Sequence, residues 1–76
     1  MGENIENKHK YRELIELKGL IREKRLNYNL MAQKIGISIS AFSNKINGKT
    51  VFTLLEALDI ISILEIDANE ISKYFF

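Results

Sequence analysis

The chain has 76 residues, 46% hydrophobic and 28% charged, with a formal net charge of +1, one histidine and no cysteine. A chain of this length forms one small domain, because it buries only about 60% of the surface that it exposes when unfolded. The composition argues against disulfides, zinc sites and histidine-based catalysis. No signal peptide or run of roughly 20 apolar residues occurs. We therefore expect a cytoplasmic, non-enzymatic protein without a membrane span, cofactor, metal or small-molecule ligand.

Charge is unevenly distributed along the chain. Residues 8–49 hold ten Lys and Arg against three acids, a net charge of +7, whereas residues 50–76 hold only Lys73 against five acids, a net charge of −4. Proteins that hold DNA neutralise phosphates with Lys and Arg, so a basic half is an expected footprint of DNA binding. Chance asymmetry in a short chain is the alternative.

The sequence favours an all-α fold, since proline is absent and only four glycines interrupt it. Residues 1–9 are polar without a pattern, and we expect a flexible arm there, followed by a single domain over residues 10–76. A first helix is predicted over residues 11–24. Its inward residues, spaced by three and four, are Leu14, Leu17, Ile21 and Leu20. Gly19 within this helix is expected to allow close approach of another helix.

Residues 27–48 predict two short amphipathic helices joined by a turn, the pattern of a helix-turn-helix. Asn27 and Ser38 are the predicted N-caps of the two helices. Gly36 supplies the turn, and Gly48 ends the second helix, which runs to about Asn47, in the left-handed conformation.

The second of these helices carries the functional prediction. At about 100° per residue, Phe42, Ile46 and Ile39 fall in one sector that docks on the first helix, opposite a sector of hydroxyl and amide side chains. The polar sector consists of Ser40, Ser43, Asn44 and Asn47. Such side chains can reach base edges in a major groove, and they are weaker helix formers than Glu or Lys. A plain αα-hairpin with a solvated polar face is the alternative.

Two further helices are predicted beyond Gly48. Thr53 and Glu56 form a capping box before a helix over residues 54–64. Its core candidates are Leu54, Leu55, Leu58, Ile61 and Leu64, with Ile60 and Ile63 widening the apolar face. Asp67 and Glu70 signal the start of a last helix over residues 68–74, with Ile66 and Ile71 spaced as a hydrophobic staple. The terminal Tyr74, Phe75 and Phe76 are expected in the core or partly in a dimer surface.

Residues 17–64 resemble the Cro/CI-type (XRE-like) helix-turn-helix regulators, and in particular small phage-derived members. The matching residues are Ala32, Gly36, Ile37, Ser38, Phe42, Ile46, Asn47 and Gly48, followed by Lys49, Thr50, Phe52 and Thr53. The resemblance implies a five-helix, lambda-repressor-like DNA-binding domain whose second and third helices form the motif. Tyr28 stands where the family often has a phosphate-binding glutamine.

By this resemblance, the base-reading positions are Ile39, Ser40, Ser43 and Asn44. The phosphate-contacting residues are expected to be Tyr28, Ser38, Lys45, Asn47, Lys49, Thr50, Arg22 and Arg25. Arg22 and Arg25 also suit the negative end of the first helix, so capping of the helix dipole is an alternative role for both.

The predicted function is sequence-specific regulation of transcription, most simply repression, by a homodimer on a two-fold operator with half-sites about one helical turn apart. The alternative is a protein-interaction module of the same fold, an antitoxin or antirepressor, that acts through Leu30, Ile39 and residues 74–76.

Overall fold

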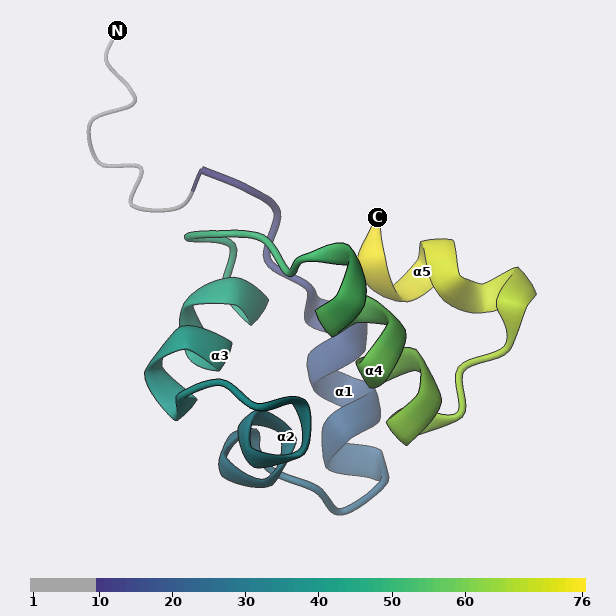
Figure 1. Cartoon of the computed structure of the whole chain (residues 1–76). Coiled ribbons are helices and arrows are strands. Elements are labelled where there is room, and N and C mark those ends of the chain that lie inside the picture. The colour runs from purple at the N-terminus through teal and green to yellow at the C-terminus, as the bar shows by residue number, and fades with distance from the viewer. Residues whose placement is uncertain (1–9) are drawn as a thin grey trace, which may run out of the picture.

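The computed structural model describes residues 10–76, which form an all-helical fold with no strand among them (Figure 1). Five α-helices and one 3₁₀ turn follow one another: α1 (Ile15–Glu23), α2 (Tyr28–Ile35), α3 (Ile39–Ile46), α4 (Leu54–Leu64), η2 (Ala68–Glu70) and α5 (Ile71–Phe75). The all-α prediction is confirmed. No helix of this part of the chain has the length and apolar character needed to cross a membrane. The predicted arm, residues 1–9, lies outside the described residues.

Local signals in the sequence fix the ends of the middle helices. The Asn27 side chain accepts a hydrogen bond from the Leu30 N–H at 2.8 Å, and the Ser38 hydroxyl accepts one from the Ala41 N–H at 3.0 Å, so both predicted N-caps form. Gly36 ends α2 in the left-handed conformation with φ +79°. The turn between α2 and α3 is therefore short, and the two helices pack against each other.

The core lies where α1, α2, α3 and α4 meet. Its fully or almost fully buried side chains are Leu17, Ile21, Met31, Ala32, Phe42, Ile46, Ile60 and Leu64. Ile66, which follows α4, also belongs to this core. Four aromatic rings form a continuous series of contacts. The ring centroids lie 5.4 Å apart for Tyr28 and Phe42, 5.3 Å for Phe42 and Phe52, and 6.5 Å for Phe52 and Phe75. This ring series joins α2 and α3 to the C-terminal helix.

The first helix is shorter than predicted. It begins at Ile15, not at residue 11, because the preceding segment pairs its backbone with the end of α3. The Tyr11 N–H donates to the Gly48 oxygen at 2.8 Å, and the Leu14 N–H donates to the Ile46 oxygen at 3.0 Å. These long-range bonds hold residues 11–14 out of the helix. Gly19 also differs from its prediction, since an added Cβ there would meet no other described atom within 4 Å.

Helix α4 has the predicted bounds, but only two of its five core candidates turn inward: Leu64 is buried and Ile61 is half-buried. Three core candidates, Leu54, Leu55 and Leu58, are 74%, 73% and 51% exposed, while Ile60 is fully buried. Three inward-facing residues, Glu56, Ile60 and Leu64, are spaced by four and form one stripe. Since apolar residues occur on every side of α4, periodicity alone does not fix its rotation. In the structure Glu56, bonded to Lys45 and Thr53, lies on the same side as Ile60 and Leu64.

The C-terminal segment differs from a single helix over residues 68–74. It forms the 3₁₀ turn η2 and then α5, and the Asp67 side chain makes no capping bond; the Asp67 backbone oxygen instead accepts from the Glu70 N–H at 2.9 Å. Ile66 belongs to the core and Ile71 packs partly on it, while their predicted contact as a hydrophobic staple stays a prediction. Residues 74 and 75 pack partly on the core, whereas Phe76 is 76% exposed.

Candidate functional site

Helix α3 has one buried side and one open side. Phe42 and Ile46 are fully buried, whereas Ser40 and Asn44 are exposed and, within residues 10–76, make no side-chain hydrogen bond. Ile39 shares the apolar sector of Phe42, but it is 49% exposed because it is the first residue of the helix. The open side of α3 thus presents the aliphatic side chain of Ile39, the hydroxyl of Ser40 and the carboxamide of Asn44.

The remaining polar residues of α3 are half-buried and are used within the chain. The Asn47 amide donates to the Ser43 hydroxyl at 3.3 Å, and the Asn47 side-chain oxygen accepts from the Lys18 ammonium at 2.6 Å. Lys18 also pairs with Glu13. These bonds attach the end of α3 to α1. The predicted polar sector is therefore divided: Ser40 and Asn44 are open, while Ser43 and Asn47 lie at its inner edge.

Lys45 has a partner inside the fold. Its ammonium lies 2.7 Å from the Glu56 carboxylate, and the two side chains are only 16% and 15% exposed. Sequence reasoning placed Lys45 at a phosphate; in the structure it holds α3 against the start of α4. The Lys45 ammonium is therefore paired within the fold, unlike the exposed cations around α3.

Glu56 serves both helices that it touches. Its carboxylate also accepts from the Thr53 N–H at 2.9 Å, while the Glu56 N–H donates to the Thr53 hydroxyl at 3.1 Å, which completes the predicted capping box. Burial raises the pKa of Glu56, but the bonds from Lys45 and Thr53 outweigh burial, so the pKa lies below its usual value. The carboxylate is thus held in the charged form.

The segment after α3 folds back on the end of that helix. The backbone oxygen of Asn44 accepts from the Lys49 N–H at 2.9 Å and from the Thr50 N–H at 3.4 Å. Gly48, with φ +90°, allows this turn. Its backbone lies so close to residue 11 that an added Cβ would be 2.5 Å from the backbone oxygen of Tyr11. Lys49 and Thr50 are both exposed, so their side chains stand free beside the C-terminal end of α3.

A shallow hollow of about 460 Å³ lies at the other end of α3, where α1 ends and α2 begins. It brings together three residues that the sequence placed in the site, namely Arg22, Tyr28 and Ile39. Lys18 and Asn27 also line it, and sequence reasoning missed them as site residues. The spacing of Lys18 and Arg22, four residues apart on one helix, is the signal that predicts their shared face.

The other two predicted phosphate residues, Arg25 and Ser38, do not line this hollow. Arg25 is exposed just beyond α1, in the left-handed conformation with φ +62°. Ser38 is exposed, but its hydroxyl oxygen is occupied as the cap of α3. Its O–H remains able to donate a hydrogen bond.

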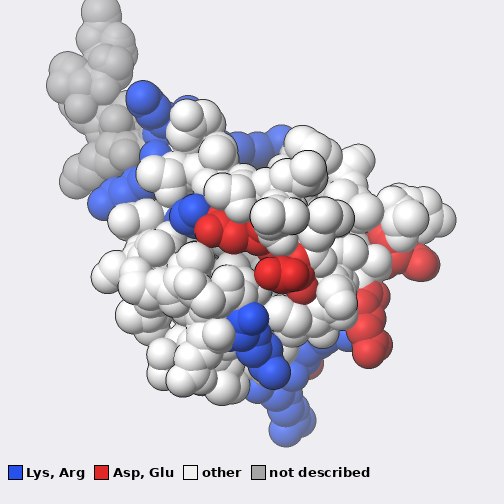
Figure 2. Space-filling view, in the orientation of Figure 1, with Lys and Arg blue, Asp and Glu red and all other residues white. Residues whose placement is uncertain are grey.

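The surface charges follow the division seen in the sequence. Figure 2 shows an uncharged surface over α3, with blue Lys and Arg atoms at its upper and lower edges, and red acidic atoms on the side of α4 and α5. The uncharged surface over α3 is therefore flanked by cations.

Within residues 10–76, no three His, Cys, Asp or Glu side chains are grouped so that they can share a metal ion.

Comparison with known proteins gives one family. Its description is "protein of unknown function (DUF739)", and it matches residues 9–76, nearly the whole chain. No curated protein matches the chain.

Proposed function

The chain belongs to the DUF739 family of proteins of unknown function, and for this member we propose sequence-specific DNA binding that regulates transcription, most simply by repression. The observation that carries the proposal is the open side of α3. A short helix, anchored by Phe42 and Ile46, points exposed Ser40 and Asn44 outward and is flanked by exposed cations.

The arrangement of α2 and α3 supports a helix-turn-helix reading. The helices are joined by a turn that begins at Gly36 and ends at the Ser38 cap, and they pack on each other. In a helix-turn-helix the second helix lies in the major groove. This role fits the resemblance to Cro/CI-type regulators, in which five helices form a lambda-repressor-like domain.

Base reading is assigned to the side chains that α3 leaves open. A carboxamide such as that of Asn44 can donate to and accept from an adenine edge, and a serine hydroxyl such as that of Ser40 can bond either base of a pair. Ile39 suits a thymine methyl group. Ser43, half-buried beside Asn47, is placed at the edge of the reading surface.

Phosphate contacts are assigned to the two flanks of α3. Lys49 and Thr50 stand at its C-terminal end. Arg22 and Tyr28 line the hollow at its N-terminal end, Ser38 caps that end, and Arg25 lies just beyond α1. Contacts of this kind fix the register of the helix on the duplex without reading sequence. Lys45 and Asn47 support the site from within, because their polar groups bond Glu56 and Lys18.

A homodimer on a two-fold operator completes the proposal. One α3 offers few reading side chains, so a single copy distinguishes few base pairs. Two copies related by two-fold symmetry place two recognition helices in successive major grooves, about 34–36 Å apart. The regulator then reads two half-sites about one helical turn apart.

Salt dependence tests the proposal against its main competitor. Fluorescence anisotropy of a labelled duplex, titrated with the full chain at several salt concentrations, is expected to show affinity that falls steeply as salt rises, because phosphate contacts release counterions. Absence of duplex binding even at low salt would refute DNA binding.

The competing function is a protein-interaction module of the same fold, an antitoxin or antirepressor. The exposure of apolar residues favours it: Leu30 is 38% exposed, Ile39 is 49% exposed and Phe76 is 76% exposed. A protein contact through these side chains is apolar and depends little on salt, which is the opposite of the behaviour expected with DNA.

A further inference from the structure

Helix α4 exposes an apolar surface that no other part of residues 10–76 covers. Leu54, Leu55 and Leu58 on the helix are exposed, as are Val51 before it and Phe76 at the far end of the chain. A helix that is apolar on nearly every side is normally buried on every side. We call these five residues the α4 surface.

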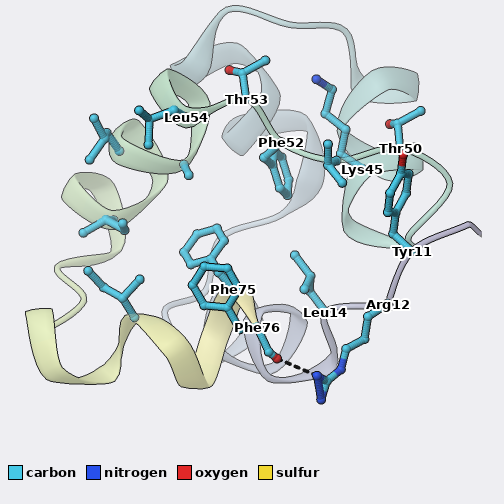
Figure 3. Close-up of a pocket in the computed structure, with 15 residues that line it drawn as sticks. Tyr11, Arg12, Leu14, Lys45, Thr50, Phe52, Thr53, Leu54, Phe75 and Phe76 are labelled. Carbon is cyan, nitrogen blue, oxygen red and sulfur yellow. Dashed lines mark hydrogen bonds between the residues drawn. The ribbon is translucent and has the colours of Figure 1, made fainter.

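A groove of about 700 Å³ runs beside this helix (Figure 3). Leu54 and Leu58 line it from α4, and Tyr11 and Phe76 line it from the two ends of the described chain. The Arg12 guanidinium donates to the Phe76 oxygen at 2.6 Å, which ties the two ends together at the rim. The walls of the groove are thus fixed by a contact between distant segments.

Leu55 lies outside the groove although it neighbours Leu54 and Leu58 on α4. It does not line the groove, and it is 73% exposed. An apolar projection therefore stands directly beside an apolar hollow. Two-fold rotation makes such a surface complementary to itself, because the projection of each copy meets the hollow of the other.

We propose that a second copy of this chain docks on the α4 surface, with Leu55 of each copy seated in the groove of the other. This assignment deepens the proposed function and rests on it for its purpose, since it supplies the second copy that a two-fold operator requires. The contact itself needs no DNA.

The exposed area fits a second copy. The five residues expose on the order of 600 Å², given their exposed fractions, against roughly 600–1,000 Å² per partner in specific interfaces. The charges beside the surface fit as well: Asp59 follows Leu55 by one helical turn, and Arg12 lines the groove, so two copies can bring opposite charges together.

The position of the groove keeps the open side of α3 accessible. Ser40 and Asn44 do not line the groove; Lys45 is the α3 residue that does, and Thr50, assigned above to a phosphate, lines it as well. Dimerisation through α4 therefore leaves the proposed base-reading side chains Ser40 and Asn44 outside the contact.

Sedimentation velocity of the full chain over a range of concentrations tests the proposal. The unmodified chain is expected to form a dimer. Leu55→Glu and Val51→Glu are expected to weaken self-association at least about tenfold, because each buries an unpaired carboxylate in the apolar contact. Ile15→Glu is the matched control, since Ile15 is 66% exposed but does not line the groove. Circular dichroism checks that all three variants remain helical.

Each result decides the matter. A chain that stays monomeric at the highest attainable concentration would overturn the assignment, and so would variants Leu55→Glu and Val51→Glu that dimerise as the unmodified chain does. A loss of dimer in Ile15→Glu equal to theirs would also overturn it.

The outcome is separable from the proposed function. A dimer lost in Leu55→Glu, from a chain that binds no duplex, would support the interface and refute DNA binding. A chain that binds duplex but stays monomeric in sedimentation would support DNA binding and refute the α4 interface.

Discussion

The Lys45 ammonium and the Glu56 carboxylate lie 2.7 Å apart and join helix α3 to the first turn of α4. The pair is only partly open to solvent, and the same carboxylate caps α4 through the Thr53 N–H. One side chain thus both caps the start of α4 and bonds that helix to α3.

Glu56→Gln is expected to lower the free energy of unfolding at neutral pH by about 1–2 kcal/mol, since it replaces charge-assisted hydrogen bonds by neutral ones. Chemical denaturation measures the change. Glu16→Gln, the same change at an exposed acid on α1, is the control and is expected to stay within about 0.5 kcal/mol of the unmodified chain.

The same pair predicts a dependence of stability on pH. The folded state lowers the pKa of Glu56, so its contribution is complete above the unfolded value of about 4.3 and is lost as pH falls through the folded value. The difference in stability between the unmodified chain and Glu56→Gln should therefore shrink in acid. A difference that stays constant from neutral pH to well below 4 would contradict the assignment.

How far the sequence predicts this fold depends on whether a signal is local. The caps at Asn27, Ser38 and Thr53 and the left-handed glycines are local, and all were predictable. The rotation of α4 was not, because Leu54, Leu55 and Leu58 are as apolar as the residues that are buried. The start of α1 was also missed, since the segment before Ile15 is held by bonds to Ile46 and Gly48, more than thirty residues away.

The candidate site divides in the same way. The sequence identifies the exposed Ser40 and Asn44, because helical periodicity separates them from Phe42 and Ile46. It does not identify which polar residues bond inside the chain. Lys45 finds Glu56 and Asn47 finds Lys18 only once the helices have packed.

Gly48→Ala is expected to destabilise the fold by roughly 2 kcal/mol or more. Its φ of +90° is strained for any side chain, and a Cβ would lie 2.5 Å from the Tyr11 oxygen. Gly36→Ala is the matched comparison, because it has φ +79° and no described atom within 4 Å of the added Cβ. We expect Gly36→Ala to lose less stability than Gly48→Ala in thermal denaturation. Equal losses of stability in the two variants would show that the close approach of Gly48 to residue 11 has no role.

Gly19→Ala is expected to stabilise the chain by about 1 kcal/mol. The residue is exposed in the middle of α1, the added methyl group meets no described atom within 4 Å, and alanine is the better helix former. Thermal denaturation measures the gain. A destabilised variant would indicate that another molecule packs on this face of α1.

Asn44→Ala and Lys49→Ala separate base reading from phosphate binding. Asn44→Ala is expected to reduce the discrimination between preferred and unrelated duplexes by about 1–3 kcal/mol. Lys49→Ala is expected to weaken both duplexes about equally and to reduce the salt slope by about 1. Titrations at fixed salt and across salt measure both effects, with exposed Ser62→Ala on α4 as the control. Equal loss on both duplexes for Asn44→Ala would remove its base-reading role.

Selection of bound sequences from random duplex DNA tests the central claim, sequence-specific recognition by α3, most directly. We expect a consensus with two-fold symmetry, whose half-sites lie about 10 base pairs apart, and we expect Asn44→Ala to lose the preference at one position in each half-site. Recovered DNA that is no different from the starting pool would contradict the claim.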